Sequence, residues 1–251
     1  MPRPNYKLAA MTYEEAQRVI DRGAVALLPC GATEAHGPHL PLDTDVVISA
    51  EASERAASLL ARDGLYAAVL PPIAYSVADF AVGFGGTISL PADVVRGYVR
   101  AVCQGAIQAG FRGVVLCNAH LEPQNVDLLR SVALESAQRG QRVQFPDITK
   151  KPHALRLGDE FRSGACHAGS YETSLVLAAD PFRVREVGNE LPPNPVSLSA
   201  AIREGKLSFV EAGGPRAYFG DPAAASAVSG DELYDELADI FASAAREVLA
   251  P

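Results

Sequence analysis

The chain has 251 residues, of which 48% are hydrophobic and 21% charged, which is enough apolar material for one large globular domain. Its formal net charge is −8, and its 22 Lys and Arg residues are scattered rather than gathered into a stripe. This distribution argues against nucleic acid and against an anionic membrane surface as partners, and it favours a small-molecule or peptide substrate.

Neither a targeting segment nor a membrane span is predicted. Residues 1–7 lack the apolar core of a signal peptide, and no later apolar run approaches the roughly eighteen residues of a membrane span. The four cysteines, Cys30, Cys103, Cys117 and Cys166, lie far apart without a Cys-x-x-Cys pair, which argues against a zinc knuckle or a disulfide framework. We therefore expect a cytoplasmic protein.

Apolar runs alternate with stretches of helical spacing along the chain. Short apolar segments predict buried strands at residues 25–28, 67–70, 113–117 and 142–145. Helical spacing, capping residues and closing glycines predict helices between Thr12 and Gly23 and at 46–60, 91–109, 123–140, 173–179 and 231–249. Strands that alternate with helices imply an α/β fold with a mostly parallel sheet covered by helices on both faces.

We expect a single domain over residues 1–251. Two stretches fit the alternation poorly. Residues 146–166 are less regular, and between about 185 and 225 the composition turns to Pro, Gly and Ser with weak periodicity. The second stretch predicts a long surface excursion or an arm onto a partner subunit.

The densest group of chemically active side chains follows the first predicted strand, in residues 30–45. Its members are Glu34, His36, His39, Asp43 and Asp45. A second polar loop follows the third strand and carries His120 and Glu122, and a third carries His167 and Glu172. Because polar loops after parallel strands meet at the same edge of the sheet, we expect these loops to converge.

Two imidazoles and three carboxylates, from Glu34, His36, Asp45, His120 and Glu122, form a mixed nitrogen and oxygen set. Such a set suits Zn²⁺, Mn²⁺ or Fe²⁺ better than Ca²⁺. Two divalent ions can be held if one carboxylate bridges them, and Asp45 is the candidate for the bridge. Two ions that share an activated water provide the chemistry of amide hydrolysis.

A proton must also reach the leaving nitrogen, and the third loop offers His167 for this transfer, with Glu172 to orient or recharge its imidazole. Glu172 can instead satisfy N–H groups at a helix start. Cys166 beside His167 is a poor nucleophilic dyad, because adjacent residues in an extended segment point in opposite directions.

Two further residues in the first loop leave alternatives open. Asp43 competes with Asp45 for the carboxylate role, although Asp45 lies at a helix N-terminus that favours an ionised carboxylate. His39, between two prolines, fits a loop-fixing residue as well as one that contacts a metal ligand, and it is not included among the predicted ligands.

These motifs also resemble the creatininase family of metal-dependent amidohydrolases. The resemblance covers residues 20–182 and is carried by Gly-Ala-Thr-Glu-Ala-His-Gly-Pro-His-Leu-Pro-Leu-Asp-Thr-Asp at 31–45, Gly-Thr-Ile-Ser-Leu at 86–90, Asn-Ala-His-Leu-Glu at 118–122 and His-Ala-Gly-Ser-Tyr-Glu-Thr-Ser at 167–174. It implies a three-layer α/β/α fold, a binuclear metal site and a homo-oligomer, commonly a hexamer.

Carried over position by position, the resemblance implies one metal held by Glu34, Asp45 and His120. It implies the other held by His36, Asp45 and Glu122, with His167 as the proton-transferring histidine. Many relatives take the last carboxylate from a Glu directly after His-Ala-Gly, but that position here is Ser170. In this respect the chain resembles creatininase itself, which supplies the ligand from the His-x-Glu pair.

Other departures bear on the substrate. Relatives often carry a Ser and a Glu-His pair before the stretch at 84–87, and these polar side chains are missing here; the chain also contains no Trp, with which creatininase closes over its flat substrate. Creatinine is therefore not the expected substrate. The leading hypothesis is hydrolysis of a cyclic or other non-peptide amide. The alternatives are the same metal chemistry on a short peptide tail or a sugar-derived ring, or a non-catalytic binding protein.

Overall fold

The structure is a computed structural model and describes residues 5–250. Its centre is a sheet of four parallel strands in the order β2-β1-β3-β4. The strands are β1 (Val25–Cys30), β2 (Ala67–Val69), β3 (Val114–Asn118) and β4 (Val143–Gln144). All four predicted strands are confirmed, although β4 is limited to two residues.

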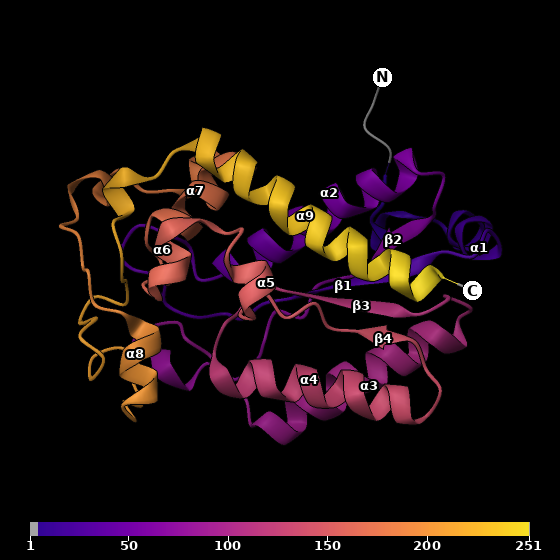
Figure 1. The fold of residues 1–251 in the computed structure, drawn as a ribbon, viewed down its shortest axis with the longest axis horizontal. Coiled ribbons are helices and arrows are strands. Elements are labelled where there is room, and N and C mark those ends of the chain that lie inside the picture. The colour runs from indigo at the N-terminus through magenta and orange to yellow at the C-terminus, as the bar shows by residue number, and fades with distance from the viewer. Residues whose placement is uncertain (1–4, 251) are drawn as a thin grey trace.

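Helices cover both faces of this sheet (Figure 1). One face packs against α2 (Thr44–Arg62) and α9 (Ala227–Leu249), and the other against α3 (Ala92–Gln108) and α4 (Pro123–Gln138). Side chains of β1 alternate between the two cores, with Val25 and Leu27 in one and Ala26 and Leu28 in the other, as a strand buried on both faces requires. The predicted three-layer α/β/α fold is confirmed.

Five further α-helices complete the described chain. Thr12 caps the first of them with the predicted capping box, since its hydroxyl accepts from Glu15 N–H at 3.3 Å and its own N–H donates to Glu15 Oε2 at 2.7 Å. The five are α1 (Tyr13–Asp21), α5 (Lys151–Ala154), α6 (Gly158–Ser163), α7 (Ser170–Ala179) and α8 (Leu198–Arg203). Two of these, α5 and α6, lie in the stretch predicted to be irregular.

Two helix starts differ from the prediction. Helix α7 begins at Ser170, so part of the predicted polar loop is helical. Helix α9 begins at Ala227, one turn earlier than predicted, because the Ser226 hydroxyl caps it by accepting from Ser229 N–H at 3.1 Å. The glycine inside its first turn, Gly230, allows close packing on α7, since a Cβ there would lie 1.9 Å from Ser174 O.

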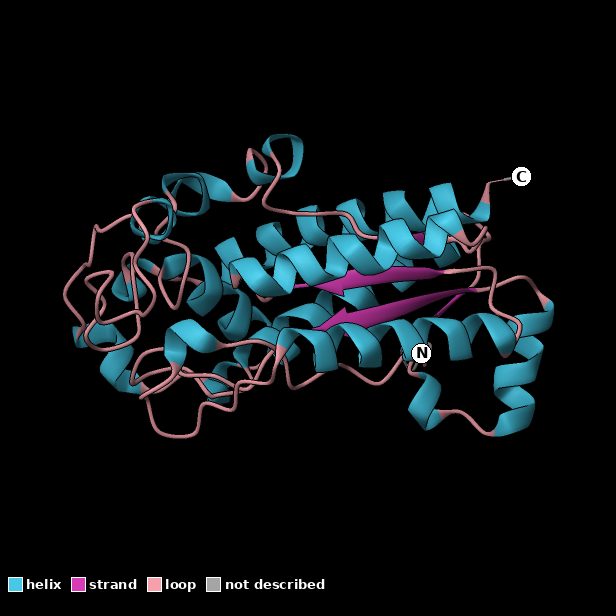
Figure 2. Ribbon diagram, turned by 90° about the horizontal axis from the view of Figure 1, so that it is seen from below, coloured by secondary structure: helices cyan, strands magenta, loops and turns pink. Residues whose placement is uncertain are grey.

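The carboxyl ends of the strands point to the end of the molecule where most of the irregular segments gather, together with α6 and α8 (Figures 1 and 2). The segment 185–225 lies at this end, and its Leu198, Phe209 and Phe219 are buried in a third apolar cluster together with Phe80. Within residues 5–250, no helix combines the length and the apolar character that crossing a membrane would require.

Candidate metal centre

The loops that follow β1 and β3 start side by side, because the two strands end level with each other. Cys30 pairs with Asn118 in parallel register, and Ala119 N–H donates to Cys30 O at 3.0 Å. The first loop carries the Glu-x-His pair at 34–36 and the second the His-x-Glu pair at 120–122. The topology of the sheet therefore brings the two predicted ligand pairs to one place.

Asp45 joins this group from the first turn of α2. The helix comes so close to the end of β1 that a Cβ at Gly31 would lie 2.6 Å from Val46 N, so only glycine fits at that position. The N-terminus of a helix stabilises a negative charge, which favours the ionised form of Asp45.

Asp45 lies between two imidazoles. Its Oδ1 is 3.2 Å from His36 Nε2, and its Oδ2 is 3.0 Å from His120 Nδ1. Glu34 Oε1 approaches His120 Nδ1 to 3.2 Å, and Glu172 Oε2 approaches His36 Nε2 to 3.6 Å. None of these five residues is more than 2% exposed. Asp45 thus occupies the central position that a bridging carboxylate needs.

Each of the two imidazoles is held by a backbone carbonyl, which contacts the ring nitrogen that points away from Asp45. His36 Nδ1 lies 3.2 Å from Glu34 O, and His120 Nε2 lies 2.5 Å from Val77 O. A ring nitrogen that faces a carbonyl oxygen carries the proton, so the opposite nitrogen presents its lone pair. His36 Nε2 and His120 Nδ1, the two nitrogens that face Asp45, are therefore oriented as metal ligands.

Apart from the imidazole–carboxylate contacts described above, several buried atoms of this group and of the neighbouring Glu122 have no hydrogen-bond partner in the described chain: Glu34 Oε2, His36 Nε2, Asp45 Oδ2 and Glu122 Oε1. Buried polar atoms are nearly always satisfied, so convergent orphans indicate a missing partner such as a cation. Three sets of three residues in the described chain each bring their ligand atoms within 4.8 Å of one another: Glu34, Asp45 and His120; His36, Asp45 and Glu172; and Glu34, His36 and His167. The first two sets share Asp45. The imidazole nitrogens and carboxylate oxygens present here are a donor set that fits divalent transition-metal ions.

The mutual proximity of these groups shifts their pKa values in the metal-free protein. Burial lowers the pKa of His36, but the carboxylates of Asp45, Glu172 and Glu34 outweigh it and raise that pKa to about 10. The pKa of His120 is likewise raised well above its usual value by Glu34 and Asp45, against the effect of burial. Burial raises the pKa of Glu172 to about 8.

Metal binding is expected to release protons and to tighten as pH rises. At pH 7 the raised pKa values keep His36 and His120 protonated in the metal-free protein, and a metal must displace those protons. Affinity should increase between pH 6 and 9 by roughly tenfold per pH unit for each competing proton. Calorimetry in buffers of different ionisation enthalpy measures how many protons are released when the metal binds. His153→Ala, on α5 away from the cluster, is the control and should leave this number unchanged. A pH-independent affinity would contradict this expectation.

The remaining predicted site residues flank this cluster. Glu122 is 7% exposed and its Oε2 accepts from Phe80 N–H at 3.4 Å, but it belongs to none of the three ligand sets found in the described chain. Burial raises the pKa of Glu122 to about 7. The prediction that Glu122 completes the second metal position therefore stays a prediction.

His167 stacks on His36, with ring centroids 4.4 Å apart, and its Nε2 lies 3.0 Å from Ala35 O. Burial and the charge of His36 lower the pKa of His167 to about 4, so its imidazole is neutral at pH 7. Glu172 Oε2 accepts from the N–H of Ala168, which has a left-handed φ of 52°, at 2.6 Å. Glu172 thus faces His36 rather than His167.

The structure separates the residues that the sequence left as alternatives. Asp43 points away from the cluster, is 45% exposed and pairs with Arg183 at 2.9 Å. His39 is fully buried and its Nε2 bonds Thr173 Oγ1 at 2.9 Å, which ties the first loop to α7 beside Glu172. Burial raises the pKa of the Cys166 thiol to about 12, which is far from a reactive thiolate.

A buried amide network behind His120 was not found from the sequence. Asn125 Nδ2 donates to His120 O at 2.8 Å and to Asn118 Oδ1 at 3.0 Å, and its Oδ1 accepts from Ser76 at 2.7 Å. This network holds the backbone of His120 in place. In the sequence, only the two asparagines at 118 and 125, on either side of the His-x-Glu motif, could have indicated this network.

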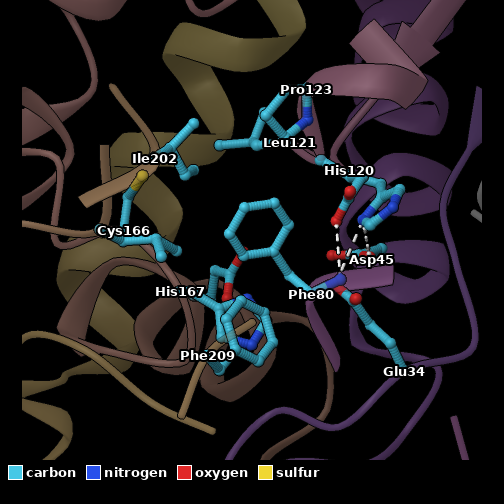
Figure 3. Close-up of a pocket in the computed structure, with 13 residues that line it drawn as sticks. Glu34, Asp45, Phe80, His120, Leu121, Pro123, Cys166, His167, Ile202 and Phe209 are labelled. Carbon is cyan, nitrogen blue, oxygen red and sulfur yellow. Dashed lines mark hydrogen bonds and ion pairs between the residues drawn. The ribbon is translucent and has the colours of Figure 1, made fainter. Parts of the chain in front are cut away.

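Apolar side chains close the site on the side away from α2. A cavity of about 40 Å³ lies between the cluster and Phe80, Leu198, Ile202 and Phe209 (Figure 3). The segment 185–225 therefore contributes directly to the wall of this site, through residues that the sequence did not single out.

Comparisons with known proteins agree with this architecture. The profile of the creatininase family, described as creatinine amidohydrolase, matches residues 9–245. A mycofactocin precursor peptide peptidase of Mycobacterium tuberculosis is 32% identical over 224 residues, which cover 85% of this chain and 81% of the relative. A creatinine amidohydrolase of Pseudomonas putida is 29% identical over 192 residues, covering 68% and 70%.

Among solved structures, a creatininase with Mn superposes with a TM-score of 0.73 over 99% of this chain and 100% of its own, at 23% identity, which indicates a shared fold. The resemblance inferred from the four motifs is thus confirmed over nearly the whole chain, and with it the hydrolase class. This protein belongs to the creatininase family of hydrolases.

Proposed function

We propose that this protein is a binuclear metal-dependent hydrolase that cleaves an amide C–N bond. The observation that carries the proposal is the convergence of oriented imidazole nitrogens and buried carboxylate oxygens on Asp45. Divalent ions such as Zn²⁺ or Mn²⁺ would supply Lewis-acid activation of a water molecule and of the amide carbonyl. We assign Glu34, Asp45 and His120 to one ion and His36, Asp45 and Glu172 to the other, so that Glu172 replaces the Glu122 predicted from the sequence as the last ligand.

Two residues on the cavity side are placed to handle protons and substrate. Glu122 lines the cavity with an unpartnered Oε1, so it can accept or donate a proton or contact a metal from that side. His167 also lines the cavity, and its Nε2 is held by Ala35 O, which leaves Nδ1 as the nitrogen that can take up a proton.

For the substrate, we propose an amide near the end of a short peptide. The peptidase relatives support this choice, since they align with 85% of the chain at 30–32% identity, against 68% at 29% for the creatinine amidohydrolase. The small volume of the cavity, about 40 Å³, favours the second candidate, a cyclic or other non-peptide amide.

Metal reconstitution followed by a substrate screen tests the proposal. Purified protein is stripped with a chelator, reloaded with Zn²⁺, Mn²⁺ or Fe²⁺, and assayed by mass spectrometry on short peptides and on cyclic amides. We expect about two ions per chain and a mass gain of one water, with fragment release for a peptide and without it for a ring. Failure to bind transition metal, or hydrolysis that a chelator does not affect, would contradict the proposal.

A further inference from the structure

The cavity beside the cluster has two chemically different walls. On one side lie the carboxylates and imidazoles, and on the other lie Phe80, Ile202 and Phe209, with Leu121 and Leu198 beside them. Figure 3 shows the ring of Phe80 in the middle of this space, between Ile202 and Cys166 on one side and His120 and Asp45 on the other. A substrate that reaches the metal side must therefore place its neighbouring group against apolar side chains.

The apolar wall is in direct contact with predicted site residues, namely His167 and Glu122. The ring of Phe209 stacks on His167 with centroids 4.2 Å apart, and it lies 6.1 Å from the ring of Phe80. Phe209 N–H donates to Phe80 O at 2.9 Å, while Phe80 N–H donates to Glu122 Oε2. These contacts connect the apolar wall to His167 and Glu122, next to the groups that would hold the metals.

The apolar half of the cavity offers no partner to a charged group. Of the thirteen described residues that line it, four are carboxylates and none is Lys or Arg. A charged or strongly polar substituent that entered the apolar half would lose its hydration without gaining a partner, which is costly. A neutral hydrocarbon group meets no such penalty.

We propose that Phe80, Ile202 and Phe209 form a specificity subsite that receives a neutral apolar group, such as a branched aliphatic or aromatic side chain, next to the scissile amide. The proposal rests on the proposed function, because it takes the reacting amide to lie at the cluster around Asp45. Phe80, Ile202 and Phe209 act here as specificity-determining residues.

The cavity is too small to hold a side chain unless one of its walls moves. About 40 Å³ holds roughly three water molecules at 10–15 Å³ each, so a side chain enters only if a wall moves. Phe209 lies between Gly205 and Gly213, both with left-handed φ, and α8 ends at Arg203 just before Gly205, whereas the Phe80 N–H donates to Glu122 Oε2. Once this wall moves outward, the entering group packs against the side chains of Phe80, Ile202 and Phe209.

Hydroxamates test this subsite without turnover, because the hydroxamate group chelates the metals and its substituent reports on the neighbouring space. Acetohydroxamate, 4-methylpentanohydroxamate and succinic monohydroxamate are titrated by calorimetry into the Zn²⁺-loaded protein. We expect the branched compound to bind at least about tenfold more tightly than acetohydroxamate. The succinic compound should bind no more tightly than acetohydroxamate.

Two variants assign the preference to the named residues. Phe209→Ala should reduce the advantage of the branched compound to about threefold or less, with the Kd of acetohydroxamate nearly unchanged. Ile202→Lys adds a cation to the cavity and should reverse the preference, so that the succinic compound binds best. Phe182→Ala, at a side chain that is 96% exposed, is the matched control and should leave every Kd unchanged.

The outcomes separate this inference from the proposed function. If the protein takes up no metal, or takes it up but does not bind acetohydroxamate, the proposed function fails and the subsite fails with it. If acetohydroxamate binds and the three compounds have equal Kd values, the subsite alone is refuted. An unchanged preference in Ile202→Lys with native metal content refutes it as well, even if Phe209→Ala does not fold.

Discussion

Asp45→Asn is expected to remove most of the bound metal and to lower hydrolysis by at least about three orders of magnitude, because Asp45 is the carboxylate shared by both ligand sets. The amide keeps the volume of the side chain but loses its charge, and it can no longer use both oxygens toward His36 and His120. Three orders of magnitude correspond to about 4 kcal/mol of transition-state stabilisation.

Asp43→Asn is the matched control, two positions earlier. Asp43 is 45% exposed and pairs with Arg183 on the surface, and exposed ion pairs contribute only about 0–1 kcal/mol to stability. Metal content measured by mass spectrometry and hydrolysis should both stay within about twofold of the native protein. Equal losses in the two variants would show that the bridging position has been assigned incorrectly.

The sequence could not separate Asp43 from Asp45 by spacing, since both lie beside the start of a predicted helix. The structure separates them because α2 begins at Thr44, which turns Asp43 outward to Arg183 and Asp45 inward. The partner of Asp43 lies 140 positions along the chain. Local patterns carry no information about such a contact.

The architecture of the sheet was predictable because each strand is a short apolar run, and parallel strands with helical crossovers leave few arrangements. That topology also places the loops at 34–36 and 120–122 together. Their side-chain orientation depends on Val77 O and on the backbone of Glu34, and sequence spacing does not reveal these acceptors.

The apolar wall of the cavity was missed for a different reason. Phe80 lies in a glycine-rich loop and Phe209 in the stretch rich in Pro, Gly and Ser, where weak periodicity predicts surface exposure. Both are nevertheless at most 8% exposed, because they pack on each other and Phe209 also packs on His167. Long-range contacts between aromatic side chains override a local composition typical of loops.

Glu172→Gln is expected to remove one of two metal ions per chain, whereas Glu122→Gln retains both. Glu172 brings a carboxylate oxygen to within 3.6 Å of His36 Nε2 and completes the second ligand set with Asp45. Glu122 Oε2 instead accepts from Phe80 N–H, and its other oxygen faces the cavity. Glutamine preserves the volume in both variants, so packing is matched and the charge alone differs.

Metal content and the electron paramagnetic resonance of the Mn²⁺-loaded protein distinguish the two variants. The native protein and Glu122→Gln should show the exchange-coupled signal of paired Mn²⁺, and Glu172→Gln should show only the signal of an isolated ion at Glu34, Asp45 and His120. Hydrolysis should fall in both variants, by about two orders of magnitude or more, because each loses either an ion or a cavity carboxylate. If Glu122→Gln loses the coupled signal and Glu172→Gln keeps it, Glu122 is the ligand, and Glu172 acts only through Ala168 and the start of α7.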